Sequence, residues 1–131
     1  VLDRLLFTDF VSDQELIALY KNSLALVMPT FFGPTNLPPL EAFKIGVPVI
    51  YPDLNGLRQQ VGNAALLIDL NDPNSLSEAI IKLLENKNLK NDLITKGYKI
   101  ASKSKNYNRI EALESILITF LQKYSNFRTR F

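Results

Sequence analysis

Cysteine and histidine are both absent from the 131 residues of this chain. Without cysteine there is no disulfide, no thiol nucleophile and no cysteine metal site. Without histidine the chain lacks the commonest general base and the commonest zinc ligand. Any chemistry must therefore use carboxylates, lysine, arginine, hydroxyls or backbone groups.

Long apolar runs are absent too, since none approaches the roughly 20 residues that a membrane-spanning helix needs. The first residues show no signal-peptide layout. Hydrophobic residues make up 47% and charged residues 21%, which excludes a disordered or collagen-like chain. We expect a single α/β domain over residues 1–131, located in the cytoplasm, and the lack of an initial methionine suggests a piece of a longer protein.

Charge is unevenly distributed, although the net value is only +2. Residues 1–81 carry four basic and nine acidic groups, a net charge of −5, and residues 82–131 carry eleven basic and four acidic groups, a net charge of +7. The basic half is either the solvated outer face of helices or a surface for an anionic membrane. Aromatic residues do not alternate with basic ones as a single-strand platform requires, so we expect no nucleic-acid partner.

Short apolar runs alternate with helical patterns along the chain. Four runs are predicted to be strands buried on both faces: Arg4–Thr8, Leu24–Met28, Val47–Tyr51 and Ala65–Ile68. Helices are predicted over residues 13–22, 38–45, 57–61, 73–86, 88–102 and 107–124. This order is typical of a Rossmann-like parallel sheet with flanking helices and right-handed crossovers.

Local signals fix several helix ends. Ser12 precedes Glu15 by three residues, which is the spacing of a capping box. Gly46 is expected to be a left-handed cap, and Asp72 to cap the helix that starts at Pro73. The strand at Leu24–Met28 is followed by a loop and a helix that begins with two prolines.

Ligands of parallel sheets bind outside the carboxyl ends of the strands, which singles out the loops 8–13, 29–37 and 51–56. The loop 29–37 leads into a helix whose free amides and positive end suit a phosphate. Gly33 and Asn36 can supply the unusual backbone angles of a close approach to a ligand. Glu41, placed in the first helical turn, either accepts two hydroxyl hydrogens of a ribose or only neutralises the helix dipole.

Other residues near these loops have two interpretations each, one as ligand-binding residues and one as purely structural residues. Arg58 could reach the ligand crevice, or it is a solvated charge on a short helix. Phe31 and Phe32 could stack on a base, or they pack within their loop. Asp9 and Asp53 each follow a strand but lack the neighbouring acids of a phosphoacceptor site, so we take both as turn or cap residues.

The stretch from Thr30 to Ile50, TFFGPTNLPPLEAFKIGVPVI, resembles the signature of family-four glycosyltransferases of the GT-B fold. The resemblance extends upstream through residues 10–20 and downstream through residues 62–80, about 80 residues in all. It implies that the chain belongs to the C-terminal, donor-binding domain of a retaining enzyme of the hexosyltransferase type. The substrate would be a nucleotide-sugar, with no metal and no other cofactor.

The resemblance also implies roles for particular residues. Glu41 would hold the ribose hydroxyls of the donor, and amides around Thr35, Asn36 and Leu37 would face its sugar or diphosphate. Gly33 and Pro34, in the same loop, would also belong to the donor-binding site. The family pattern has two glutamates with seven residues between them, but the first position here is Gly33. Asn36 also replaces a usual glycine, and its side-chain amide is a hypothetical substitute for the missing sugar contact.

Gly33 keeps a second class of function open, a non-catalytic nucleotide-binding or sugar-binding module. A third hypothesis is that the chain belongs to a GT-B sugar-nucleotide epimerase. The family's acceptor-binding N-terminal domain and the first strands of its C-terminal domain are not in this sequence, so we expect the chain alone to be inactive. The expected partners are the nucleotide-sugar donor, that missing domain and an anionic surface at the inner face of the membrane.

Overall fold

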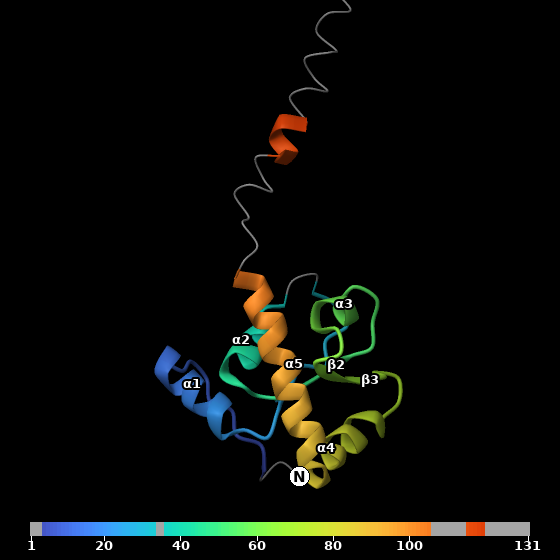
Figure 1. Ribbon diagram of the computed structural model, residues 1–131. Helices are drawn as coiled ribbons and strands as arrows, with labels where there is room; N and C mark the ends of the chain where they lie inside the picture. Colours follow the sequence, from blue (N-terminus) through green and yellow to red (C-terminus); the bar gives the residue numbers. More distant parts are fainter. Residues whose placement is uncertain (1–3, 34–35, 106–114, 120–131) are drawn as a thin grey trace, which may run out of the picture. The chain divides into compact units, whose positions relative to one another are not determined.

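The computed structural model describes residues 4–33, 36–105 and 115–119. The chain divides into two compact units, residues 1–101 and residues 102–131, and each is described by itself. The first unit contains a parallel three-stranded sheet in the order β1-β2-β3, with helices on both faces (Figure 1). This arrangement confirms the predicted α/β class.

Helices and strands alternate as expected from the pattern of apolar residues. Their bounds are α1 Asp13–Asn22, β1 Leu26–Val27, α2 Leu37–Ile45, β2 Val49–Pro52, α3 Leu57–Val61, β3 Ala65–Ile68, α4 Ser75–Glu85 and α5 Lys87–Lys105. In the sheet Leu26 lies opposite Val49, and Ile50 lies opposite Leu66. The carboxyl ends of all three strands therefore lie along one edge of the sheet, as the ligand-site rule requires.

The prediction of a strand at Arg4–Thr8 is wrong. Residues 5–9 have no regular secondary structure, and the side chains of Leu6 and Phe7 are 85% and 82% exposed. A strand needs a neighbour to accept and donate its ladder hydrogen bonds, and no described strand pairs with this segment. The extended run ends at Asp9, whose φ of 48° makes it a turn residue.

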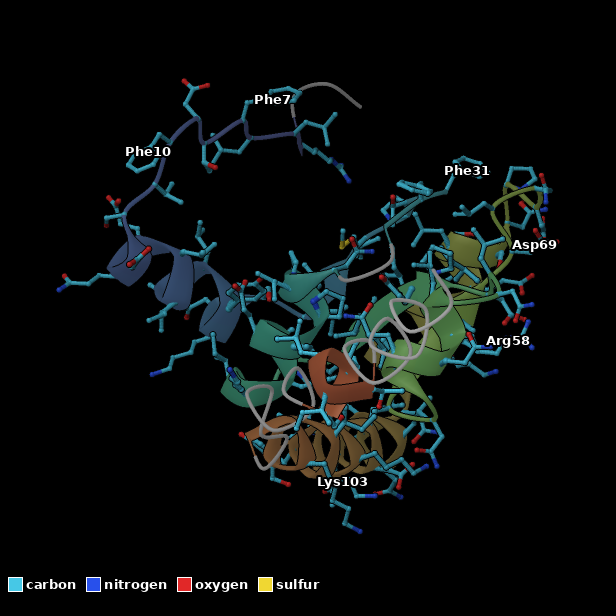
Figure 2. All side chains as sticks on the ribbon, turned by 90° about the horizontal axis from the view of Figure 1, so that it is seen from above. Phe7, Phe10, Phe31, Arg58, Asp69 and Lys103 are labelled. Atoms are coloured by element: carbon cyan, nitrogen blue, oxygen red, sulfur yellow. The ribbon has the colours of Figure 1, made fainter. Side chains whose placement is uncertain are left out.

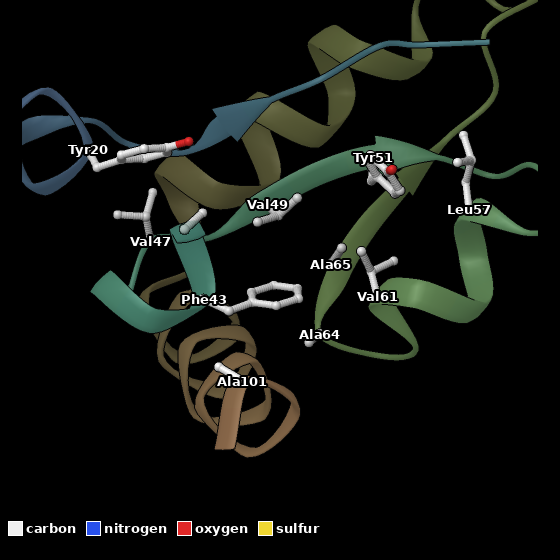
Figure 3. Packing of buried hydrophobic residues seen from close by; sticks show 11 residues of the cluster. Tyr20, Phe43, Val47, Val49, Tyr51, Leu57, Val61, Ala64, Ala65 and Ala101 are labelled. Carbon is white, nitrogen blue, oxygen red and sulfur yellow. The ribbon is translucent and has the colours of Figure 1, made fainter. Parts of the chain in front are cut away.

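Two clusters of apolar side chains cover the two faces of β2. Val49 and Tyr51 point to one face, where they pack with residues of α2, α3 and α5 such as Phe43 and Val61 (Figure 3). Ile50 points to the other face, in a cluster that includes Leu83 of α4. This alternation explains why β2 reads as an unbroken apolar run, since a strand covered on both faces has no polar side.

The local signals at helix ends are mostly confirmed. Ser12 and Glu15 form the capping box at α1, and the hydrogen bonds from Ser12 hold the pKa of Glu15 below its usual range. Gly46 ends α2 in the left-handed conformation, with a φ of 84°. The cap of α4 is Asn74 rather than Asp72, because the Asp72 carboxylate accepts the amide hydrogen of Asn74 at 2.9 Å and forms a turn before the helix.

Helix α5 is longer than predicted, and it brings Leu93 and Ala101 into the core clusters. The helix expected over residues 107–124 lies largely outside the described residues; within them, 115–119 are helical. Among the described helices, none combines the length and the apolar character needed to cross a membrane.

Candidate functional site

The loops that follow β1 and β2 enclose a pocket of about 200 Å³ at the carboxyl edge of the sheet. Phe31, Phe32 and Gly33 line it from the first loop, and residues 55–57 line it from the second. Two of the three loops singled out from the sequence therefore meet. Larger hollows of about 250 and 560 Å³ lie along α1, and the smaller of these two also borders β1; residues such as Leu19 and Ser23 line both of them.

The two phenylalanines of the first loop do not pack within it. Phe31 is 72% exposed and Phe32 is 84% exposed, and Figure 2 shows Phe31 projecting away from the body of the unit. The loop-packing interpretation of these side chains is therefore wrong. Their ring faces are accessible to a planar or apolar part of a ligand.

The wall of the pocket opposite Phe31 and Phe32 is formed by residues 55–57, and hydrogen bonds from α3 stabilise it. The side-chain oxygen of Gln59 accepts the amide hydrogen of Gly56, and its side-chain nitrogen donates to the Asn55 side chain at 3.0 Å. Gly56 itself has a φ of 89°, which favours glycine. The turn that lines the pocket is thereby fixed by its own helix.

The N-terminus of α2 offers fewer amide donors than its sequence position suggests. An α-helix leaves the backbone nitrogens of its cap and first three residues without internal partners. Here those residues are Asn36, Leu37, Pro38 and Pro39, and proline carries no amide hydrogen. Asn36 and Leu37 therefore carry the only two amide hydrogens among these four, and Leu37 is 62% exposed at the helix start.

Glu41 is the fifth residue of α2, so the prediction that it lies in the first turn is wrong. The effect of the helix dipole falls off within that turn, which leaves little support for a purely neutralising role. The Tyr20 phenol donates to Oε2 of Glu41 at 3.4 Å. Burial and, second to it, the Glu41 charge raise the pKa of Tyr20 above its ordinary value. The carboxylate is thus oriented from α1, and it does not line the pocket between the loops.

Asn36 has no hydrogen bond from its side chain to the helix that it caps. Its side-chain nitrogen donates instead to the Tyr51 hydroxyl, which in turn donates to Oε1 of Gln60 at 3.3 Å. Gln60 completes the ring by donating from Nε2 to the backbone oxygen of Asn36. The hypothetical sugar contact of Asn36 would therefore compete with an internal partner for the amide hydrogens.

Gly33 lies directly against Asn36. Its φ is 149°, and a Cβ at this position would come within 2.2 Å of the Asn36 side-chain oxygen. Only glycine fits here without a shift of Asn36. Pro34 and Thr35, also predicted to face the ligand, lie outside the described residues.

Arg58 is not brought into the pocket. Its Nε lies 2.5 Å from Oδ1 of Asp53, and both side chains are about half exposed, at 52% and 44%. Figure 2 shows Arg58 projecting outward from α3. In the part of the chain that the structure describes, no three acidic side chains come close enough together to hold a metal ion.

Sequence reasoning missed three residues of this region: Tyr20, Tyr51 and Gln60. Their partners lie 21, 15 and 24 residues away in the chain, so no local pattern reports them. One signal was available for Tyr51, a phenol at the end of an otherwise aliphatic strand. A buried tyrosine hydroxyl usually has a hydrogen-bond partner, so this residue could have been flagged.

Known proteins with sequences similar to this chain include two that are named mannosyltransferases. The chain is 35% identical over 79 residues to O-antigen chain mannosyltransferase B of Escherichia coli, covering 60% of this chain and 21% of that protein. It is 35% identical over 78 residues to O-antigen chain mannosyltransferase RfbU of Salmonella typhimurium, covering 60% and 22%. The matches thus span about a fifth of the length of these curated relatives.

The fold is similar to that of sucrose-phosphate synthase from Thermosynechococcus elongatus, with a TM-score of 0.74 and 26% identity, over 93% of this chain and 31% of that one. This similarity confirms the predicted Rossmann-like fold of the GT-B class. The family described as glycosyl transferases group 1 matches residues 1–100, which is most of the chain. The chain therefore belongs to the glycosyl transferases group 1.

Proposed function

We propose that this chain is the donor-binding portion of a retaining glycosyltransferase, which transfers a sugar from a nucleotide-sugar to a glycan or a lipid-linked acceptor. The observation that carries the proposal is the pocket between the loops after β1 and β2, whose lining residue Gly33 lies against Asn36, the cap of α2. That is the place where a parallel α/β sheet binds nucleotides. The exposed aromatic faces of Phe31 and Phe32 line this pocket.

The donor would lie along the N-terminal half of α2. Asn36 and Glu41 are five residues apart, which is about 7.5 Å along a helix axis. A nucleotide-sugar is longer than this, so it can extend from the pocket to Glu41. In this arrangement the amides of Asn36 and Leu37 bind the diphosphate, and the Glu41 carboxylate accepts the hydroxyl hydrogens of the ribose.

Charge on the departing diphosphate would be stabilised by these amides and by the positive end of α2. No metal is needed in this scheme. The two prolines at positions 38 and 39 limit the amide donors to two, so we infer that further phosphate ligands come from other parts of the full enzyme.

The sugar is a hexose in this proposal. Curated relatives are named mannosyltransferases, which makes a mannosyl donor the first to test. Those proteins are about five times longer than the matched region. We propose that a separate N-terminal domain binds the acceptor and that the 131-residue chain alone does not turn over.

The direct test is an amide-resolved NMR titration of the chain with UDP, GDP, ADP and their sugar derivatives. Localised shifts are expected at Asn36, Leu37 and Glu41, and Glu41→Ala should abolish them. Glu85→Ala is the matched control, because Glu85 is an exposed residue at the far end of α4. The absence of shifts with every nucleotide would contradict the proposal.

Gly33 supports a second candidate, a module that binds a nucleotide or sugar without catalysis. The carboxylate that the family pattern places at this position is missing, and Asn36 fills the adjacent space. Transfer from a labelled donor by the full protein that contains this chain separates the two candidates. Binding without transfer would favour the module.

We also propose that the protein works on the cytoplasmic side of an anionic membrane. Exposed lysines on α4 and on the part of α5 within the first unit, among them Lys82, Lys87 and Lys99, supply the positive charge. Such a surface is attracted to anionic lipid within a Debye length. Retention on phosphatidylserine vesicles at low salt, lost at high salt, is the expected result; no retention at low salt would rule it out.

A further inference from the structure

A closed ring of hydrogen bonds lies directly behind the pocket. Tyr51 accepts from the side chain of Asn36 and donates to Gln60, which in turn donates to the backbone of Asn36. The three residues come from the loop before α2, from β2 and from α3. The ring therefore joins the two walls of the pocket to the central strand of the sheet.

The Tyr51 hydroxyl is not required by the sheet itself. Tyr51 is completely buried, and an aliphatic side chain would satisfy a central strand equally well. A buried hydroxyl is costly unless it is hydrogen-bonded, so its presence points to the contacts that it makes. Figure 3 shows the Tyr51 oxygen on the side of the strand that faces α3.

The two prolines of α2 explain why Asn36 is available to Tyr51. An asparagine at the cap of a helix normally accepts an amide hydrogen from the second or third helical residue. In α2 those residues are Pro38 and Pro39, which have no amide hydrogen, and Asn36 makes no capping bond. Its side chain turns to the phenol instead.

Gly33 completes the arrangement. The Asn36 side chain, held by Tyr51, occupies the space that a Cβ at position 33 would need, with only 2.2 Å between them. The loop thus passes close to Asn36 and on toward the exposed Phe31 and Phe32. A fixed Asn36 side chain therefore limits where Gly33, which lines the pocket, can lie.

We propose that Tyr51 is a positioning residue for donor binding: its buried phenol, through Asn36 and Gln60, sets the path of the loop that lines the pocket and the start of α2. The inference rests on the proposed function, because it assumes that the donor binds in this pocket. Tyr51 touches no ligand in this scheme and acts only through Asn36.

The experiment compares Tyr51→Phe with the unaltered chain in titrations with GDP-mannose and UDP-glucose. We expect the dissociation constant of whichever donor binds to rise roughly five-fold, the usual effect of one lost hydrogen bond. Tyr98→Phe is the matched control, since Tyr98 is a half-exposed phenol on α5, outside the ring. Gln60→Met perturbs the same ring from α3 and should act in the same direction.

A double-mutant cycle separates positioning from general destabilisation. If Tyr51 acts through Asn36, then Tyr51→Phe in an Asn36→Ala background causes no further loss of affinity. Additive losses, or unaltered affinity in Tyr51→Phe, would overturn the positioning role while leaving the donor site in place. Absence of donor binding by the unaltered chain would overturn the proposed function and the positioning role together.

Discussion

The hydroxyl of Tyr20, on α1, lies 3.4 Å from Oε2 of Glu41, on α2, and adds a polar contact where these two helices pack against each other. Tyr20 is 9% exposed, so the phenol is held by packing rather than by solvent. The phenol therefore gives the Glu41 carboxylate a hydrogen-bond donor that comes from 21 positions earlier in the chain.

Tyr20→Phe should weaken nucleotide binding while leaving the fold intact. The substitution keeps the ring and removes only the donor to Glu41, a bond whose net worth is on the order of 1 kcal/mol. We expect a few-fold rise in the dissociation constant in the NMR titration. In a Glu41→Gln background the same substitution should have a smaller effect, and an equal effect in both backgrounds would contradict the coupling.

Alkaline unfolding tests the raised pKa of Tyr20, to which burial contributes most and the contact with Glu41 contributes second. Burial and the Glu41 charge raise the pKa of Tyr20 in the folded state above its ordinary value. As the pH rises, Tyr20 therefore loses its proton in the unfolded chain before it does so in the folded chain. The stability that the protonated Tyr20 contributes is fully present below pH about 10 and is lost as the pH rises further.

Urea unfolding at pH 8 and at pH 10.5 would test whether stability falls with rising pH as expected. The unaltered chain should lose more stability between the two pH values than Tyr20→Phe does. Lysines also titrate in this range, but they are common to both proteins and cancel in the comparison. Parallel losses in the two proteins would show that Tyr20 has no raised pKa.

The features that sequence reasoning predicted correctly are the ones encoded within a few residues. Ser12 and Glu15 are three positions apart, and Gly46 directly follows the helix that it ends. The unbroken apolar run at Ala65–Ile68 predicted β3 with its observed bounds. Such signals depend on backbone geometry that neighbouring side chains determine.

The features that it missed depend on distant partners. The Arg4–Thr8 run has the composition of a strand, but a strand exists only where another one pairs with it. Tyr51 and Gln60 reach Asn36 across 15 and 24 residues. Glu41 was singled out by its expected place on the helix and by a family resemblance, whereas its hydrogen-bond donor Tyr20 was not. Contacts between residues so far apart in the chain can be predicted only when the topology of the fold is known.

Gly97→Ala should destabilise the chain, although glycine-to-alanine changes inside helices usually stabilise by about 1 kcal/mol. Gly97 is buried on α5, and an added Cβ would lie 2.7 Å from Cδ1 of Phe43. Overpacking of this kind costs about 1–3 kcal/mol. Denaturant unfolding measures the change. Phe43→Leu makes room at the contact, so the double variant should lose less than the sum of the two single changes.

Gly33→Glu, which restores the carboxylate of the family pattern, should weaken nucleotide-sugar binding rather than improve it. A Cβ at this position meets the Asn36 side chain at 2.2 Å, and the φ of 149° disfavours any residue other than glycine. The glutamate can enter only by displacing Asn36 from Tyr51 and thereby moving the pocket loop. The expected result is at least a ten-fold loss of affinity in the NMR titration, about 1.4 kcal/mol.

Asn36→Gly in the same chain should recover part of this loss. It removes the side chain that blocks position 33 and restores the glycine that the family usually has there. If the double variant binds a nucleotide-sugar more tightly than Gly33→Glu alone, positions 33 and 36 are interdependent. The chain would then have exchanged a glutamate–glycine pair for a glycine–asparagine pair in one coupled change. Equal affinity of the two variants would mean that Asn36 does not exclude a side chain at position 33, and the loop would have to be held in place by other contacts.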